Sequence, residues 1–344
     1  MERKTENLFG EVELIDDGVK TILFNQEDIL ESAFQYFREK GFPYPHMPLF
    51  RCKMELNDLA NLKQADCLNS RIGYRIADTY NTHRFHSSAA GMSSPYHSFM
   101  DDTRLKKVLQ KQFQSSGKFE YGYLGFMSLV NGTQACSNFR PAFAKMLYNQ
   151  YCPKGGVVFD SSTGYGGRLT GFLASHCSEY HGTDPNTLTH AANTKLANDL
   201  KGDKKVNLYN FPAEDLDIEH IRESCDFSFS SPPYFSKERY SDEETQSWKR
   251  YPEYEQWLQG FLKPVIKKSF DVLKSGSYFV WNIEDVILKT KKYPLVEPSI
   301  EFGKEIGFEY VRTDRFALAP RTRVVEGVKT IIQASEAVIV FIKP

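Results

Sequence analysis

Short apolar runs alternate with longer stretches of helical periodicity from about residue 155 onward. The apolar runs have the length and the alternation typical of strands, and turn-forming residues bound them. Strands are expected at 155–160, 179–184, 205–211, 225–230 and 277–283. Helices are expected between them, among them 185–200 and 254–276. Because strands and helices alternate, the pattern predicts a parallel sheet with crossover helices.

The end of the chain follows a different pattern. A helix expected at about 295–306 precedes two strand-like segments, 308–318 and 335–342, without a helical stretch between them. Two such strands are expected to pair as an antiparallel hairpin appended to the parallel sheet.

The first 135 residues lack this alternation. Residues 25–41 predict an amphipathic helix with Asn25 as its N-cap and Gly41 at its end. Residues 71–113 mix polar, aromatic and basic positions without a clear period. We therefore expect two domains, an N-terminal accessory domain at 1–135 and an α/β domain at 136–344.

Composition and charge narrow the class of protein. The chain has 344 residues, 41% of them hydrophobic and 25% charged, as in ordinary globular proteins. It contains no apolar run of the roughly 20 residues that span a bilayer, and its first residues do not resemble a secretory signal. We expect a cytoplasmic protein without a membrane partner. The six cysteines are scattered singly, so no metal site is expected.

A glycine-rich segment, "FDSSTGYGGRLTG", follows the first expected strand. Glycines between a strand and a helix allow the backbone to approach a ligand closely. The dinucleotide fingerprint G-x-G-x-x-G fails, because Leu169 stands where its third glycine should be. The segment therefore indicates a nucleotide-like ligand but disfavours a Rossmann oxidoreductase.

Two acidic residues follow the next two strands. Asp184 ends the second strand, where a carboxylate can accept hydrogen bonds from both hydroxyls of a ribose. Asp215, just after the third strand, could accept from an adenine amino group. Each could equally be a turn former or a helix cap. Their positions at successive strand ends favour the ligand-binding interpretation.

The segment "FSFSSPPYFS" is the most specific signal in the chain. A proline has no N–H and a fixed φ, and it holds the preceding residue extended. The carbonyl groups of Ser231 and Pro232 therefore have fixed directions and suit a planar amino group. Tyr234 offers a ring on which a base could stack, a contact worth about 1–3 kcal/mol. The alternative is a proline-terminated strand with a core tyrosine.

With these motifs, residues 135–344 resemble the S-adenosylmethionine-dependent DNA amino-methyltransferases. The resemblance rests on "FDSSTGYGGRLTG", "GTDPN", "PAEDL" and "DFSFSSPPYF", and on "SNFRPAFAKMLYNQY", which is similar to the segment beside the methionine end of the cofactor. It implies a Rossmann-like methyltransferase fold with a mixed seven-stranded sheet and an antiparallel last strand. It implies S-adenosyl-L-methionine as cofactor, bound by Asn138, Arg140, Pro141, Asp160, Ser161, Gly164, Gly166, Arg168, Asp184, Pro185, Glu214 and Asp215. The catalytic residues that it implies are Ser231, Pro232, Pro233 and Tyr234.

The resemblance implies methyl transfer to an exocyclic amino nitrogen of a DNA base, an activity that the family uses in restriction–modification. Ser231 favours cytosine N4 over adenine N6, because the adenine enzymes more often carry Asp or Asn there. An RNA base methyltransferase and a non-catalytic nucleic-acid-binding module remain alternatives. Arg168 is unusual at its position, where it could bind the methionine carboxylate or pair with a local acid.

DNA would have to be held by local basic patches, because the formal net charge is only −1. No large insertion lies between the motifs, so target recognition is assigned to the N-terminal region. The basic residues expected to flank the catalytic motif, or to face it, are Lys289, Lys291, Lys292, Arg312, Arg315, Arg321, Arg323, Lys329, Arg71, Arg75, Arg84, Lys106, Lys107 and Lys111.

Overall fold

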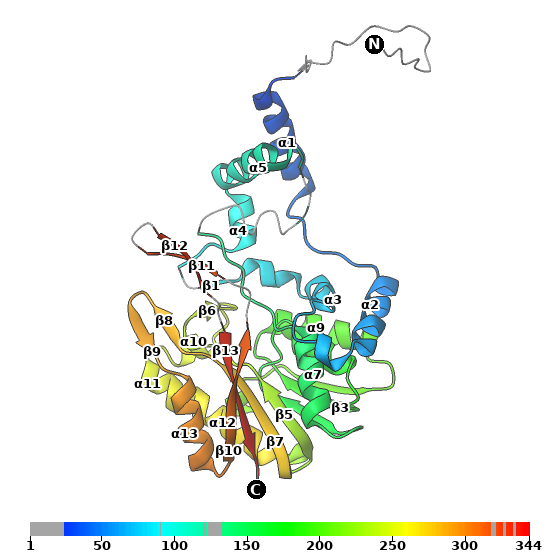
Figure 1. Ribbon diagram of the computed structural model, residues 1–344, viewed down its shortest axis with the longest axis vertical. Helices are drawn as coiled ribbons and strands as arrows, with labels where there is room; N and C mark the ends of the chain where they lie inside the picture. Colours follow the sequence, from blue (N-terminus) through cyan, green and yellow to red (C-terminus); the bar gives the residue numbers. More distant parts are fainter. Residues whose placement is uncertain are drawn as a thin grey trace.

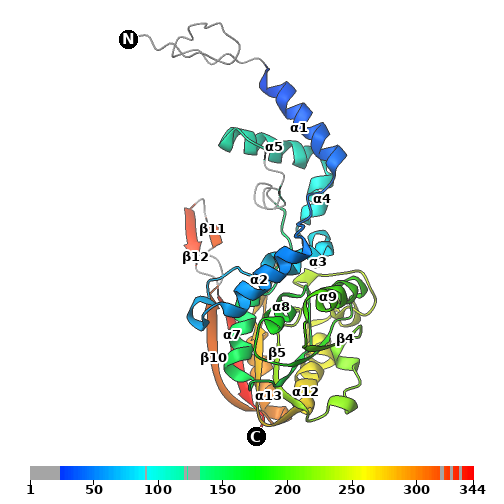
Figure 2. The same ribbon diagram turned by 90° about the vertical axis from the view of Figure 1, so that its right-hand side faces the viewer.

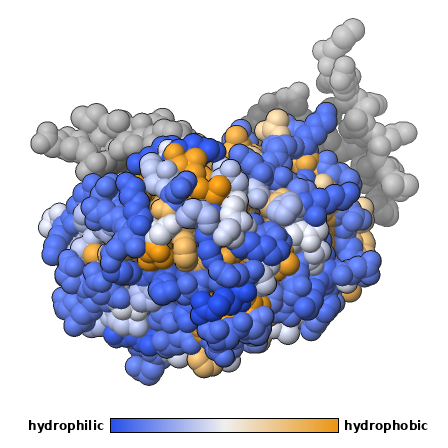
Figure 3. Space-filling view, turned by 90° about the horizontal axis from the view of Figure 1, so that it is seen from below, coloured by the Kyte–Doolittle hydropathy of each residue, from blue (hydrophilic) through white to orange (hydrophobic). Residues whose placement is uncertain are grey.

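The computed structural model describes residues 24–89, 91–119, 122 and 132–317, the backbone of 321–325 and 328–332, and residues 335–344. An α/β body holds the C-terminal part of the chain, and a group of helices stands out from its upper end (Figures 1 and 2). The C-terminus lies at the opposite end of the body. Figure 3 views the molecule from that end, where most exposed residues are hydrophilic. No helix in the described ranges is long and apolar enough to cross a membrane.

A seven-stranded sheet forms the centre of the body, in the order β10-β13-β7-β5-β2-β3-β4. All neighbouring pairs from β7 to β4 are parallel, and β13 is antiparallel to both β7 and β10. This is the Rossmann-like methyltransferase fold expected from the sequence, including the closing hairpin. The strands are β2 (Val157–Asp160), β3 (Glu179–Thr183), β4 (Lys205–Tyr209), β5 (Cys225–Ser230), β7 (Leu273–Ile283), β10 (Glu309–Ala317) and β13 (Ser335–Ile342).

Helices cover both faces of this sheet, and one hydrophobic cluster lies under each group. Phe227 and Phe229 of β5 face the cluster beneath the first group of helices, whereas Phe279 and Trp281 of β7 face the cluster beneath the second group. In each pair the two residues share a face of the sheet because side chains two positions apart along a strand point the same way. The first group comprises α7 (Pro141–Tyr151), α8 (Gly167–Leu173) and α9 (Thr187–Leu200). The second comprises α12 (Lys263–Val272) and α13 (Val296–Ile306), with α11 (Tyr254–Trp257) and a π-helical turn at Leu258–Leu262 leading into α12.

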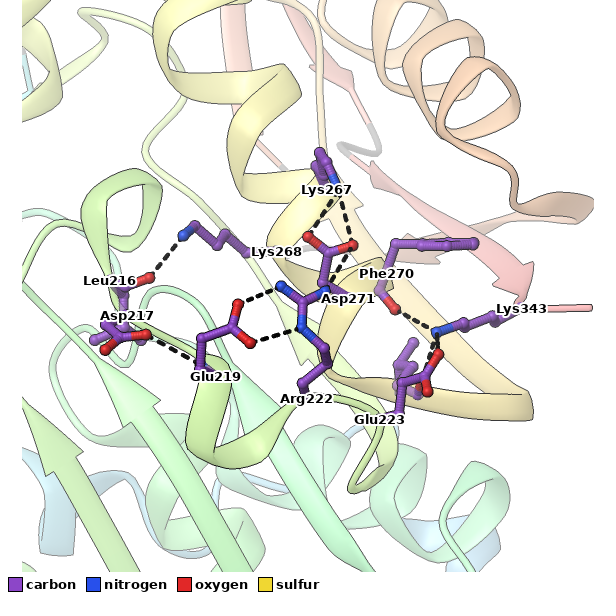
Figure 4. Close-up of polar contacts among 11 residues, drawn as sticks. Leu216, Asp217, Glu219, Arg222, Glu223, Lys267, Lys268, Phe270, Asp271 and Lys343 are labelled. Atoms are coloured by element: carbon purple, nitrogen blue, oxygen red, sulfur yellow. Dashed lines mark hydrogen bonds and ion pairs between the residues drawn. The ribbon is translucent and has the colours of Figure 1, made fainter.

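The helix expected to run to Gly276 ends earlier, at Val272, and β7 begins at Leu273. The buried Lys343 side chain explains the early end, because its Nζ donates to the carbonyls of Phe270 and Leu273 at 3.0 and 2.7 Å. The Gly276 N–H donates to the Lys343 carbonyl. Figure 4 shows the contact of Lys343 with the Phe270 carbonyl, beside the ion pair of Arg222 with Glu219. The last residues of the chain thus hold the start of β7.

The N-terminal region contains more helix than its sequence pattern predicted. The helix expected at 25–41 is confirmed as α1 (Gln26–Lys40), capped by Asn25. It packs with α4 (Pro95–Met100) and α5 (Asp102–Ser116) around a small cluster of phenylalanines and leucines. In contrast, α2 (Leu49–Asn61) and α3 (Tyr74–Tyr80) lie against α8 and α9 of the body. The division at residue 135 stays a prediction.

Short elements complete the described structure. Four 3₁₀ turns lie at Gln64–Asp66, Thr82–His86, Ala213–Asp215 and Glu219–Ile221. A bridge joins β1 (Ser88–Ala89) to β6 (Glu238–Arg239), linking the N-terminal region to the loop after the Ser-Pro-Pro-Tyr segment. The other short elements are α10 (Ser247–Arg250), β8 (Val286–Leu288), β9 (Lys291–Tyr293), and the ribbon β11 (Arg321–Val325) with β12 (Val328–Ile332).

Candidate active site

A large cleft of about 1740 Å³ lies where the carboxyl ends of the parallel strands meet the N-terminal region. Its body side is formed by the loops after β2, β3, β4 and β5, and its other side by residues between Pro43 and Arg84. Strand order reverses between β2 and β5, and open α/β sheets bind ligands at such a reversal. The cleft is therefore the candidate active site.

Most of the predicted site residues meet in this cleft. Its lining includes Asn138, Arg140, Ser161, Gly164, Arg168, Asp184, Pro185, Glu214, Ser231, Pro232, Pro233 and Tyr234. The predicted residues that do not contribute to the lining are Pro141, Asp160, Gly166 and Asp215. Pro141 is buried at the first position of α7, where a proline suits the helix start.

The loop after β2 presents polar groups to the cleft. The Gly164 N–H donates to Asp184 Oδ2 at 2.9 Å, which joins this loop to the end of β3. The hydroxyls of Ser161 and Thr163 are buried and have no hydrogen-bond partner among the described residues. Buried polar groups without a partner are rare, and water or a ligand can satisfy them. Gly166 has a different role, because a Cβ there would lie 2.6 Å from Asn193 Oδ1 in α9.

Asp160 and Arg168 form a buried ion pair behind this loop. Arg168 Nε donates to Asp160 Oδ2 at 2.8 Å, and the side chains are 5% and 0% exposed. The hydroxyls of Tyr180 and Ser230 donate to the same carboxylate at 2.7 Å each. Of the two roles expected for Arg168, the structure contains the pairing with a local acid. The network connects β2, β3, β5 and α8 beneath the cleft.

Asp184 lies where the sequence predicted it, at the end of β3 and facing the cleft. Its oxygens accept hydrogen bonds from the backbone N–H groups of Gly164 and Asn186, both at 2.9 Å. Burial raises its pKa to about 6, although these two N–H groups favour the charged form. Each oxygen keeps a lone pair free for a ligand hydroxyl.

The two acidic residues after β4, Glu214 and Asp215, do not both face the cleft as the sequence predicted. Asp215, expected to accept from an adenine amino group, has a half-exposed side chain paired with Arg250 at 2.8 Å and lies outside the cleft lining. Glu214 lines the cleft, has a side chain that is 4% exposed, and also pairs with Arg250, at 2.6 Å. Burial raises the pKa of Glu214 to about 7. The short 3₁₀ turn at Ala213–Asp215 decides which acid faces inward.

Beyond β5, a hydrogen-bond network holds the Ser-Pro-Pro-Tyr segment. Asn282 Nδ2, at the end of β7, donates to the Tyr234 hydroxyl at 2.7 Å and to Glu336 of β13 at 3.0 Å. The Ser231 hydroxyl lies 3.2 Å from that of Tyr234. Burial raises the pKa of Tyr234 well above its usual value. Sequence reasoning missed Asn282 and Glu336, which only the order of β5, β7 and β13 brings together.

Tyr234 is more enclosed than a freely exposed stacking platform would be. The residue is 6% exposed, and the Lys237 ammonium lies 5.1 Å from the centre of its ring. The next residue, Phe235, has a positive φ of 52° and is buried between Trp257 and Tyr293. Left-handed backbone is costly for a phenylalanine, so this packing holds the turn in place.

Ten of the fourteen predicted basic residues fall into three groups. The other four do not contribute to the cleft lining: Lys107, Lys111, Lys289 and Lys291. Arg71, Arg75 and Arg84 line the cleft, but Arg84 is buried against Asp78 at 2.8 Å. Others form ion pairs away from the cleft lining: Lys106 with Glu31, Lys292 with Asp285, Arg312 with Asp314, and Arg315 with Glu284. The side chains of Arg321, Arg323 and Lys329 lie outside the described residues, and DNA contact by any of these residues stays a prediction.

Comparison with known proteins gives matches at the level of the fold only. No protein-family model matches the chain, and no curated protein matches it significantly. Among solved structures, the cyclase SpnF is 13% identical, with a TM-score of 0.38 and coverage of 51% of this chain and 60% of that one. A SAM-dependent O-methyltransferase from Thermotoga maritima is 12% identical, with a TM-score of 0.36 and coverage of 59% and 64%.

A SAM-dependent methyltransferase from Methanosarcina mazei is 14% identical, with a TM-score of 0.39 and coverage of 57% of this chain and 96% of that one. The chain thus spans less than two thirds of the cyclase and of the O-methyltransferase. The fold assignment rests on the strand order and directions described above.

Proposed function

We propose that this protein transfers a methyl group from S-adenosyl-L-methionine to an exocyclic amino nitrogen of a base in DNA, with cytosine N4 favoured over adenine N6. The observation that carries the proposal is one cleft in which the Ser-Pro-Pro-Tyr segment after β5 adjoins the loop after β2. The two strands are neighbours in the sheet. An amino group held at the first segment would therefore lie beside a cofactor held at the second.

The residues present fit such a cofactor. Asp184 offers acceptors for a ribose, and the Ser161 and Thr163 hydroxyls are unpaired donors and acceptors next to it. Glu214 offers a further carboxylate on the same wall. When bound, S-adenosylmethionine supplies an electrophilic methyl group on its sulfonium.

The protein's own contribution is positioning. In this proposal the carbonyl oxygens of Ser231 and Pro232 accept hydrogen bonds from the amino group, which directs its lone pair toward the methyl. Tyr234 packs against the base, and Asn282 holds the Tyr234 hydroxyl. Placing two reactants in this way can account for a large share of a rate enhancement. A duplex target would first have to be flipped out of its stack, at a cost of a few kcal/mol.

The target class is tested by incubating the protein with methyl-labelled S-adenosylmethionine and unmethylated DNA or RNA. We expect label in DNA, and nucleoside analysis by mass spectrometry should identify N4-methylcytosine. N6-methyladenine would keep the enzyme class and correct the base. Label found only in RNA would contradict the DNA assignment, and no transfer with either polymer would contradict the proposed activity.

Cofactor binding gives a separate prediction for Asp184. S-adenosylhomocysteine should bind the wild-type protein in calorimetry, whereas NAD should not. The change Asp184→Ala should weaken this binding about tenfold or more, because a hydrogen bond to a charged group is worth about 1.5–3 kcal/mol. Asp203→Ala, in the exposed turn before β4, is the matched control. Equal affinities for the Asp184 variant and the control would refute the ribose assignment.

A further inference from the structure

Two aromatic rings form a flat surface at the edge of the cleft. Tyr44 lines the cleft and is 37% exposed, and His86, at the end of the 3₁₀ turn Thr82–His86, is exposed beside it. Their ring planes differ by only 8°. The Tyr44 hydroxyl hydrogen-bonds to His86 Nε2 at 2.5 Å, closer than the roughly 3.5 Å between the atoms of stacked rings. The two rings therefore lie side by side and form one wider surface.

Other aromatic side chains support this surface from one face. Tyr96 of α4 stacks on His86, with ring centres 3.9 Å apart and planes 20° apart. Phe42 lies against both Tyr44 and Tyr96, with ring centres 4.8 and 5.8 Å away. Because Tyr44 and His86 stay exposed although Tyr96 covers one face, the other face of the pair is accessible.

The backbone that carries Tyr44 is stiff. Pro43 and Pro45 flank it, and both also line the cleft. A proline has a fixed φ and restricts the residue before it, so Tyr44 has few backbone conformations to choose from. A ring that is already held in place loses little conformational entropy when a ligand stacks on it.

Arginine side chains on the same side of the cleft are available to phosphate groups. The charged residues that line this side, between Pro43 and Arg84, are Arg51, Arg71, Arg75, Arg84, Glu55, Asp58 and Asp78. Arg84 and Asp78 pair with each other at 2.8 Å. The other three arginines are exposed and have no ion pair among the described residues. An exposed guanidinium group suits the geometry of a phosphate.

A flat aromatic surface beside such arginines fits a nucleic-acid strand, whose bases stack on rings while its phosphates bind cations. We propose that Tyr44 and His86 form a stacking platform for the DNA base next to the target base, and that Arg71 and Arg75 bind the phosphates of that strand. This inference rests on the proposed function, because the same cleft contains the Ser-Pro-Pro-Tyr segment. A base that leaves its stack deprives its neighbour of a stacking partner, and the platform replaces that partner.

Binding of fluorescein-labelled single-stranded DNA, measured by fluorescence anisotropy with S-adenosylhomocysteine present, tests the platform. One strand has a random sequence, and a second strand of equal length has abasic sites in place of its bases. Tyr44→Ala should bind the first strand about tenfold more weakly than wild type, the effect of losing one base–aromatic contact, and the abasic strand equally well. Tyr44→Trp should retain the affinity for both strands.

Salt dependence separates stacking from phosphate binding. Arg71→Ala combined with Arg75→Ala should weaken binding of both strands. It should also lower the slope of log affinity against log salt by about 1.4, since each phosphate contact on a single strand contributes about 0.7. Tyr44→Ala should leave this slope unchanged.

The matched control is Tyr36→Ala, which removes a tyrosine of α1 that is 48% exposed and outside the cleft lining. It should bind both strands as the wild type does. Thermal unfolding checks that each variant is folded, and Tyr44→Leu, which fills the space without an aromatic face, should show the same loss as Tyr44→Ala.

Three outcomes are decisive. If Tyr44→Ala and Tyr44→Leu bind the random strand as Tyr36→Ala does, the platform is refuted and the proposed methyl transfer stands. The same holds if they lose equal affinity for both strands, because the loss would then not depend on bases. If the wild type binds S-adenosylhomocysteine but neither strand, the DNA assignment in the proposed function itself fails.

Discussion

Alanine in place of Tyr234 is expected to slow methyl transfer about 100-fold or more while the affinity for S-adenosylhomocysteine stays within about threefold of wild type. The ring would pack against the target base, a contact worth about 1–3 kcal/mol, and its loss alone lowers the rate by about one to two orders of magnitude. The remainder comes from misplacement, because Tyr234 connects Ser231 with Asn282 at the strand ends. Single-turnover kinetics and calorimetry on the same preparation measure the two effects separately.

Two variants separate the ring from the hydroxyl. Tyr234→Phe keeps the ring and should retain more activity than Tyr234→Ala. Ser231→Ala keeps the backbone carbonyl and should also retain partial activity, since the carbonyl rather than the hydroxyl is proposed to hold the amino group. Normal transfer by Tyr234→Ala, or an equal loss of cofactor affinity in that variant, would contradict the assignment of Tyr234 to the base side of the cleft.

The architecture of the α/β body could be predicted because its signals are local. Apolar runs such as 225–230 and the helical spacing of 185–200 are properties of single segments, and β5 and α9 form nearly where expected. The closing hairpin followed from the absence of a helix between its strands. The end of α12 could not be predicted in this way, because Lys343, some 70 residues away, holds it.

Side-chain directions within the candidate site were harder to predict. Sequence spacing placed Glu214 and Asp215 together after the third strand, but only the turn shows that Glu214 faces the cleft and Asp215 does not. Gln246, a buried residue of the cleft lining, lies in a polar stretch of the sequence that predicts no regular element. Its burial depends on contacts with Pro185 and Thr187, far away in the sequence.

The N-terminal region shows the same limit. The periodicity of α1 is visible because one face of a regular helix is apolar. In residues 71–113, α3 is only seven residues long and α4 six, so neither extends over enough turns to give a period. The fifteen-residue α5 does have one buried face, with Leu105, Val108 and Leu109, and its period was missed. The positions of α3 and α4 come from tertiary packing on the body and on α5, which sequence pattern does not report.

Asp160→Ala is expected to lower the free energy of unfolding by about 3–5 kcal/mol, the range typical of a buried ion pair that loses one partner. Arg168 would keep its charge with a side chain that is only 5% exposed, and the Tyr180 and Ser230 hydroxyls would lose their common acceptor. Urea denaturation measures the change in the free energy of unfolding. If the dependence of this free energy on urea concentration is the same in the variant and the wild type, their unfolded states are comparable.

Two further variants test whether the loss of stability comes from the unpaired charge of Arg168. Asp160→Ala combined with Arg168→Met removes both charges and should recover part of the lost stability, because the cost of the single change lies largely in the stranded guanidinium. Glu219→Ala is the matched control. It breaks the exposed pair with Arg222 shown in Figure 4 and should change stability little. If Asp160→Ala were no less stable than Glu219→Ala, the Asp160–Arg168 pair would not hold the floor of the cleft.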